Sequence, residues 1–185
     1  KYINMSKRPR DSIPEKKYIQ EICAVIDRSG SMRGKEEDTI CGINETFRIL
    51  RESKDINEII KISIKFFDHE QIVKLNSVNL DMVNDLSREE FQPRGQTALL
   101  DAMGDTLTYF IEKKSMDKNA YDSCIIYITT DGFENASKYY NNENIKDLIK
   151  VAEENHNIKL IYLAANQDAI FEARQYGIDI TRAMN

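Results

Sequence analysis

The chain has 185 residues, of which 41% are apolar and 31% charged, and its formal net charge is −5. A length of this order suits one domain, and the acidic balance argues against a general nucleic-acid binder. No stretch approaches the roughly 18–20 consecutive apolar residues of a membrane helix, so we expect no membrane span.

The N-terminal part of the chain changes character near residue 17. Residues 1–16 carry two prolines and several charges without apolar periodicity, which predicts a flexible leader. Residues 18–26 end in an unbroken apolar run that predicts a buried strand. A polar loop follows at 27–34, and the apolar spacing of 35–53 is typical of one helix face.

The middle of the chain predicts a hairpin followed by helices. Apolar and polar residues alternate over 59–67, as in a strand with one solvent-exposed face. Residues 68–70 suit a tight turn, after which 71–75 would return antiparallel at the edge of a sheet. A short helix is predicted at 80–86 and a longer one at 98–114.

The C-terminal part alternates buried strands with helices. Strands are predicted at 124–128 and 158–165, and a helix at 144–155 lies between them. A short helix at 168–176 would end at Gly177, and 178–180 would start a last strand.

Alternating strands and helices predict an α/β fold of the doubly wound, Rossmann-like kind. We expect one domain over residues 17–185, with a mostly parallel sheet of six strands, one antiparallel edge strand and helices on both faces. In such sheets, ligands bind beyond the carboxyl ends of the strands. The polar residues that follow the predicted strands are therefore candidates for a site.

Three separate segments bring oxygen-bearing side chains to this edge. Asp27, Ser29 and Ser31 follow the first strand as Asp-x-Ser-x-Ser. Thr97 precedes the long middle helix, and Asp131 follows the central strand. Taken singly, each segment is also typical of a turn or a helix cap. Their convergence on one edge favours a common site.

The donors of this site suit a hard cation. Every candidate ligand is an oxygen, and Mg²⁺ prefers octahedral oxygen coordination while keeping several waters. The hydroxyls can bind an ion directly, whereas Asp27 and Asp131 can bind directly or hold metal-bound water. If the carboxylates contact the ion only through bound water, the ion keeps much of its positive charge. An open coordination position would then attract an acidic group.

The three segments resemble the von Willebrand factor type A (vWA) domain family. Asp27 to Met32, Gly95 to Leu99 and Thr129 to Asn135 are similar to its metal-ion-dependent adhesion site (MIDAS), with all five positions present in order. The resemblance covers about Tyr18 to Ile180 and implies Mg²⁺ or Mn²⁺ as the cofactor. It also implies a metal-dependent module that binds a Glu or Asp of a partner protein, here of the small microbial or intracellular type.

Two other functions remain open at this stage. An enzyme could use Asp27 as a phosphotransferase nucleophile or in metal-dependent hydrolysis. Residue 29 is Ser, whereas the haloacid-dehalogenase-like motif needs a second Asp, and no phosphate-loop signature follows Gly30. We therefore expect a non-enzymatic protein. The third possibility is a structural domain whose metal site is idle.

The cysteines indicate the compartment. Cys23, Cys41 and Cys124 are an odd number of widely spaced residues without a Cys-x-x-Cys pair. This pattern is typical of a reducing environment, so we expect a cytoplasmic protein. Cys23 and Cys41 are predicted to be small core residues.

Overall fold

One six-stranded sheet organises the protein. The computed structural model describes residues 16–131, 133–164, 176 and 183–184. The sheet order is β3-β2-β1-β4-β5-β6, with β2 and β3 antiparallel and all other pairs parallel. The strands are β1 (Tyr18–Asp27), β2 (Glu58–Phe67), β3 (Gln71–Asn79), β4 (Ser123–Thr130), β5 (Ile158–Ala164) and β6 (Ala183–Met184). The predicted doubly wound sheet with an antiparallel edge strand is confirmed.

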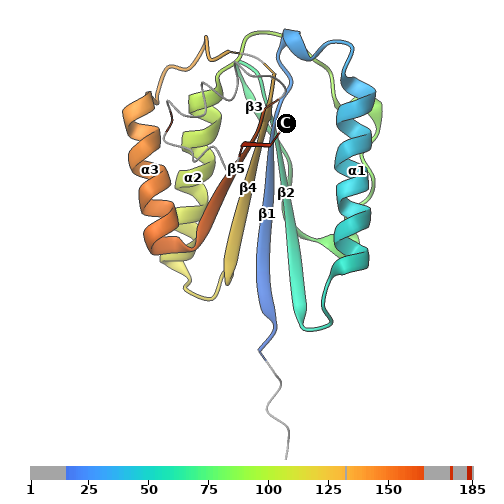
Figure 1. Ribbon diagram of the computed structural model, residues 1–185, viewed down its shortest axis with the longest axis vertical. Helices are drawn as coiled ribbons and strands as arrows, with labels where there is room; N and C mark the ends of the chain where they lie inside the picture. Colours follow the sequence, from blue (N-terminus) through green and yellow to red (C-terminus); the bar gives the residue numbers. More distant parts are fainter. Residues whose placement is uncertain (1–15, 132, 165–175, 177–182, 185) are drawn as a thin grey trace, which may run out of the picture.

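Helices cover both faces of this sheet, as Figure 1 shows. One face carries α1, and the other carries α2 and α3. The α-helices are α1 (Glu36–Ser53), α2 (Leu99–Met116) and α3 (Asn142–His156), and the 3-10 turns are η1 (Gly30–Met32), η2 (Leu80–Met82) and η3 (Arg88–Glu90). Among the described helices, none has both the length and the apolar character that crossing a bilayer requires.

Each face of the sheet has its own apolar core. Successive side chains of a strand point to opposite faces, so β1 sends Val25 toward α2 and Ile26 toward α1. Phe47 of α1 packs in the second core and Leu107 of α2 in the first. Because β1 is covered on both faces, its sequence is a continuous apolar run rather than an alternating one.

Two predictions about the edge of the sheet need correction. The expected wet face of 59–67 is largely covered, because Ser63 is buried and borders a cavity with Tyr109 of α2. The helix expected at 80–86 is a single 3-10 turn followed by extended chain. Asn44 of α1 holds that chain, since its side chain accepts a 2.8 Å hydrogen bond from the Leu86 amide.

The cysteine prediction is half right. Cys23 is buried, but Cys41 lies on the exposed side of α1 and is not a core residue. Helical spacing alone does not fix which face of α1 meets the sheet. Residues 1–15 of the predicted leader (1–16), residues 168–175 of the predicted helix (168–176) and the predicted strand at 178–180 lie outside the described residues. A strand at Ala183–Met184 completes the sheet beside β5.

The parallel strands place several loops at one edge. β1, β2 and β4 run in the same direction, so the loops after them emerge together, at the upper edge in Figure 1. The loop that leads into α2 meets them, since the Gly30 amide donates a 3.1 Å hydrogen bond to the Gly95 carbonyl. This edge is where the sequence predicts the site.

Candidate metal centre

Asp27 ends β1 and is fully buried. Its Oδ1 accepts a 2.6 Å hydrogen bond from the Ser29 amide, and its Oδ2 accepts one of 2.6 Å from the Thr130 hydroxyl. Burial raises the pKa of the Asp27 carboxyl above its ordinary value; these hydrogen bonds oppose the rise, and the nearby Asp131 carboxylate adds to it. The carboxylate is thus held in one orientation in an environment that disfavours its charge.

A continuous hydrogen-bonded path leads from Ser29 to the loop after β4. The hydroxyls of Ser29 and Ser31 are 3.0 Å apart, and Ser31 Oγ donates to Asp131 Oδ1 at 2.7 Å. The η1 turn makes this possible, because the Met32 amide closes on the Ser29 carbonyl while the Met32 side chain is buried. Four of the five predicted residues are therefore joined directly.

Thr97 reaches the group through its backbone. Its amide donates a 2.9 Å hydrogen bond to Asn135 Oδ1, and its carbonyl accepts one of 3.0 Å from the Asn135 amide. Thr97 is nearly fully buried at the start of α2. The fifth predicted residue thus lies at the same edge, tied to the loop that carries Asp131.

Glu134 and Asn135 support this arrangement rather than extend it. Glu134 Oε2 accepts a 2.9 Å hydrogen bond from the Leu100 amide at the first turn of α2. Its Oε1 accepts from the amides of Ala136 and Ser137. A carboxylate in this position satisfies free amides of the helix end and complements the helix dipole.

Lys35 brings a positive charge to the site that sequence reasoning missed. Its Nζ forms an ion pair with Asp131 Oδ2. The Lys35 side chain is about half exposed, whereas that of Asp131 is almost fully buried. The candidate ligand atoms of the five predicted residues are all oxygens, which suits a hard divalent ion, and such an ion would share Asp131 with the Lys35 ammonium.

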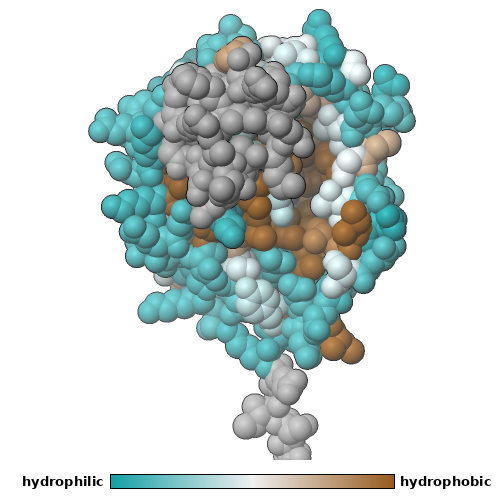
Figure 2. Space-filling view, viewed as in Figure 1, coloured by the Kyte–Doolittle hydropathy of each residue, from teal (hydrophilic) through white to brown (hydrophobic). Residues whose placement is uncertain are grey.

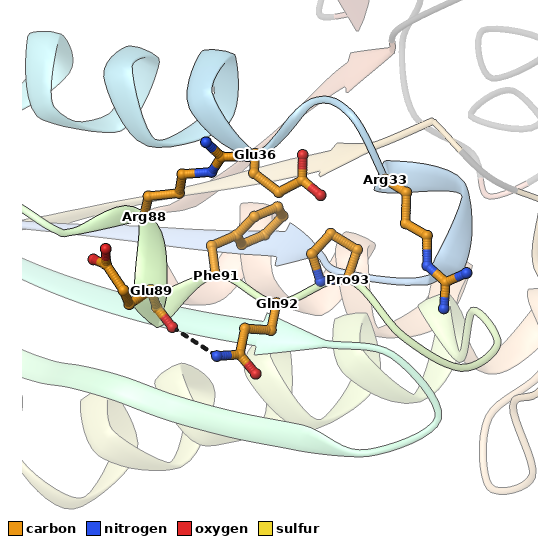
Figure 3. Close-up of a pocket in the computed structure, with 7 residues that line it drawn as sticks. All are labelled: Arg33, Glu36, Arg88, Glu89, Phe91, Gln92 and Pro93. Carbon is orange, nitrogen blue, oxygen red and sulfur yellow. Dashed lines mark hydrogen bonds between the residues drawn. The ribbon is translucent and has the colours of Figure 1, made fainter.

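Two other hollows in the molecule do not contain the five predicted residues. An open depression of about 610 Å³ lies beside the site and is shown in Figure 3. It is lined by two arginines and two glutamates (Arg33, Arg88, Glu36 and Glu89) together with Phe91, Gln92 and Pro93. An apolar groove of about 490 Å³ lies between α1 and the sheet, where a brown hollow opens in Figure 2.

A separate acidic group lies after β2. Among the described residues, Asp68, His69 and Glu70 are the group of three acidic or histidine side chains whose ligand atoms lie within 4.8 Å of one another. Asp68 is buried and pairs with Arg28 and Arg94. Sequence reasoning treated this segment as a turn. The rule that singled out Asp27, a polar residue at the carboxyl end of a parallel strand, also applies to Asp68.

Comparison with solved structures identifies the fold as vWA-like. No protein-family model and no curated protein matches the chain. One similar structure is proximal thread matrix protein 1 from the mussel byssus, described with a zinc-occupied MIDAS motif. It has 14% sequence identity and a TM-score of 0.63, over 91% of this chain and 43% of that chain.

A second similar structure is the ArnB paralog VWA2 from Sulfolobus acidocaldarius. It has 17% identity and a TM-score of 0.50, over 80% of this chain and 35% of that chain. The chain thus spans well under half the length of these proteins. At such identities the likeness shows the fold and nothing finer.

Proposed function

We propose that this protein is a divalent-metal-dependent protein-binding module. Ser29, Ser31 and Thr97 hold Mg²⁺ or Mn²⁺ through their hydroxyls, with Asp27 and Asp131 binding directly or through water. The bound ion offers an open coordination position to a carboxylate of a partner protein. In this proposal the chain performs no catalysis and acts in the cytoplasm.

One observation carries the proposal: the hydrogen-bonded path from Asp27 through Ser29 and Ser31 to Asp131. Independent turns and caps have no need to meet, and these residues come from loops about 100 positions apart. The zinc-occupied MIDAS of the mussel protein supports the same use of a similar fold. Zinc in that protein supports a divalent ion rather than Mg²⁺ or Mn²⁺ in particular.

The charges of the site agree with an acidic partner group. Asp27 is buried, and its carboxylate already accepts hydrogen bonds from the Ser29 amide and the Thr130 hydroxyl. These hydrogen bonds reduce the negative charge that Asp27 presents to a bound ion. Hydroxyl ligands are neutral and leave an ion its positive charge. A carboxylate from outside then meets a strong local field even on a protein of net charge −5.

Titration of chelator-stripped protein with Mg²⁺ and with Mn²⁺ tests the metal site. We expect saturable binding at one site, lost in Ser29→Ala and in Asp131→Ala. Circular dichroism must show that both variants remain folded. Equal binding by the wild type and by both folded variants contradicts the proposed ligands.

Capture experiments separate a binding module from the two other functions. The immobilised protein should retain a partner from native extract with Mg²⁺ but not with chelator, and Ser29→Ala should retain none. An idle structural site predicts the same capture by both proteins. Phosphate release from a generic phosphoester, abolished by Asp27→Asn, would instead favour the enzyme.

A further inference from the structure

Asp68 joins two arginines that come from different loops. Its carboxylate is fully buried, and its Oδ2 lies 2.9 Å from Arg28 Nη2 and 3.0 Å from Arg94 Nε. Arg28 is buried, whereas the Arg94 side chain is about half exposed. Arg94 Nε donates a strong, charge-assisted hydrogen bond to Asp68, whereas the contact between Arg28 and Asp68 is an ion pair. The buried carboxylate thus binds both arginines, and loss of its charge would leave the buried Arg28 without a counter-ion.

Both arginines belong to the loops that carry the proposed metal ligands. Arg28 lies between Asp27 and Ser29, and Arg94 lies three residues before Thr97. The two loops also meet directly, because the Arg94 amide donates a 2.8 Å hydrogen bond to the Arg28 carbonyl. Through its side chain, Asp68 therefore holds one loop against the other.

The backbone of Asp68 holds the second loop again, close to Thr97. The Ala98 amide donates a 3.0 Å hydrogen bond to the Asp68 carbonyl. Gly95 has a φ of +67°, and a Cβ there would lie 2.2 Å from His69 Nδ1. The loop thus passes so close to the turn after β2 that only glycine fits without movement.

We propose that Asp68 is a positioning residue for the metal site. It holds the Thr97 loop against the Ser29 loop, so that hydroxyls from two segments converge on one ion. Ion binding needs ligands placed within a fraction of an ångström, which loops achieve only when other contacts fix them. The inference rests on the proposed function, because it assigns a purpose to Asp68 only if the five residues bind a metal.

Asp68 is better explained as a positioning residue than as a ligand of a second ion. Its carboxylate already balances two guanidinium groups, and both of these would repel a cation beside it. The other two members of the group, His69 and Glu70, are exposed, and exposed groups of this kind are common without a bound ion. The negative charge of Asp68 is therefore neutralised by arginines of this chain.

Mn²⁺ titration of substituted proteins tests this role. Arg94→Gln removes the hydrogen-bonded ion pair with Asp68 at a half-exposed position. We therefore expect a folded protein whose Mn²⁺ affinity falls a few-fold. Asp68→Asn should lower the affinity about tenfold or more, as is usual for residues that orient metal ligands. Glu70→Gln is the matched control, because Glu70 binds the same Arg94 from an exposed position, and its affinity should stay within about twofold.

A double-mutant cycle distinguishes positioning from general stabilisation. If Asp68 acts through Thr97, adding Asp68→Asn to Thr97→Val lowers Mn²⁺ affinity less than Asp68→Asn does alone. Full additivity of the two losses contradicts the inference. If Asp68→Asn does not fold because Arg28 is left buried and unpaired, the same cycle is run with Arg94→Gln.

The wild-type titration decides the proposed function separately from the inference. Absence of Mn²⁺ binding by the wild type refutes the proposed function, and with it the purpose assigned to Asp68. Wild-type binding together with unchanged affinity in folded Asp68→Asn and Arg94→Gln refutes the inference alone. Amide exchange without metal should rise at Ala98 and Gly30 in the variants but not at Cys124 in β4; unchanged exchange at Ala98 and Gly30 contradicts the holding of the loops.

Discussion

The Lys35 ammonium pairs with Oδ2 of Asp131, while Ser31 donates to the Oδ1 of the same carboxylate. One proposed metal ligand is thus bound from both sides by groups of this chain. A divalent ion that uses Asp131 must compete with Lys35 for its charge. This relationship was invisible in the sequence, where the two residues are 96 positions apart.

Replacing Lys35 should strengthen ion binding. Lys35→Met removes a competing and repelling charge, so we expect Mn²⁺ affinity to rise about two- to fivefold, the range that an ion pair worth up to 1 kcal/mol allows. Without metal, the free energy of unfolding should fall by less than about 1 kcal/mol. Calorimetric titration and chemical denaturation measure the two effects.

The control for this substitution is another lysine–aspartate pair. Lys54 pairs with Asp81 near η2, away from the proposed ligands. Lys54→Met should leave Mn²⁺ affinity unchanged. Unchanged or weaker Mn²⁺ binding by Lys35→Met would mean that the ammonium does not compete with the ion.

Replacing Asp27 should separate stability from binding. Burial disfavours the Asp27 carboxylate. Asn retains an oxygen that accepts from the Ser29 amide, and its NH2 group can donate to the Thr130 hydroxyl, which accepts as well as donates. In metal-free solution at pH 7, Asp27→Asn should therefore raise the free energy of unfolding by roughly 1 kcal/mol, the usual scale of a single substitution. The same change should abolish Mn²⁺ binding, a combination typical of a residue kept for function.

Asp101 provides the comparison for Asp27. Its buried carboxylate accepts hydrogen bonds from the amides of Lys138, Tyr139 and Tyr140, so its role is structural. Asp101→Asn should destabilise the protein without changing Mn²⁺ affinity in the folded fraction. A loss of stability in Asp27→Asn like that in Asp101→Asn would argue that Asp27 is an ordinary turn residue.

Asp122 should make folding dependent on pH in the acid range. Hydrogen bonds from the Ile19 amide and from Lys16 lower the pKa of this carboxyl. Because the folded-state pKa lies below the unfolded value of about 3.9, the stabilisation is complete above that value and is lost as pH falls through the folded-state pKa. Asp122→Asn should therefore be less stable than the wild type at pH 7 and equal to it at the lowest pH.

Denaturation curves at a series of pH values check this expectation. Lys16→Met leaves the Ile19 hydrogen bond in place, so its loss of stability at pH 7 should be smaller than that of Asp122→Asn. A difference between wild type and Asp122→Asn that persists unchanged into strong acid would show that charge is not its cause.

The three thiols should differ in reactivity. Cys23 and Cys124 lie in the apolar core, and burial raises the pKa of Cys23 to about 12 and that of Cys124 as well. Cys41 is exposed on α1. A thiol reagent at pH 8 should modify one cysteine rapidly and the other two only after unfolding, since the thiolate is the reactive form.

Counting modified thiols in native and in denatured protein tests this. Cys41→Ser should remove the rapid phase and leave the slow one. Rapid modification of two or more thiols in the native wild type would show that the core over α2 opens readily.

The sequence predicted most of the helices and strands and pointed to five site positions because both inferences depend on local patterns. A continuous apolar run marks β1, apolar residues at helical spacing mark α1, and Asp-x-Ser-x-Ser marks a single turn. The sequence did not reveal which residues from other elements contact them. Thr130 binds Asp27 because parallel pairing sets Ile26 beside Thr129, which is a property of strand register.

By itself the sequence determined that this chain forms alternating strands and helices and carries oxygen donors after particular strands. Only the tertiary structure decided that Lys35 pairs with Asp131, that Asp68 joins the two loops, and that Cys41 faces away from the core. The reason is physical. Secondary structure follows from the spacing of neighbouring side chains, whereas contacts between loops depend on the order and register in which distant strands pack.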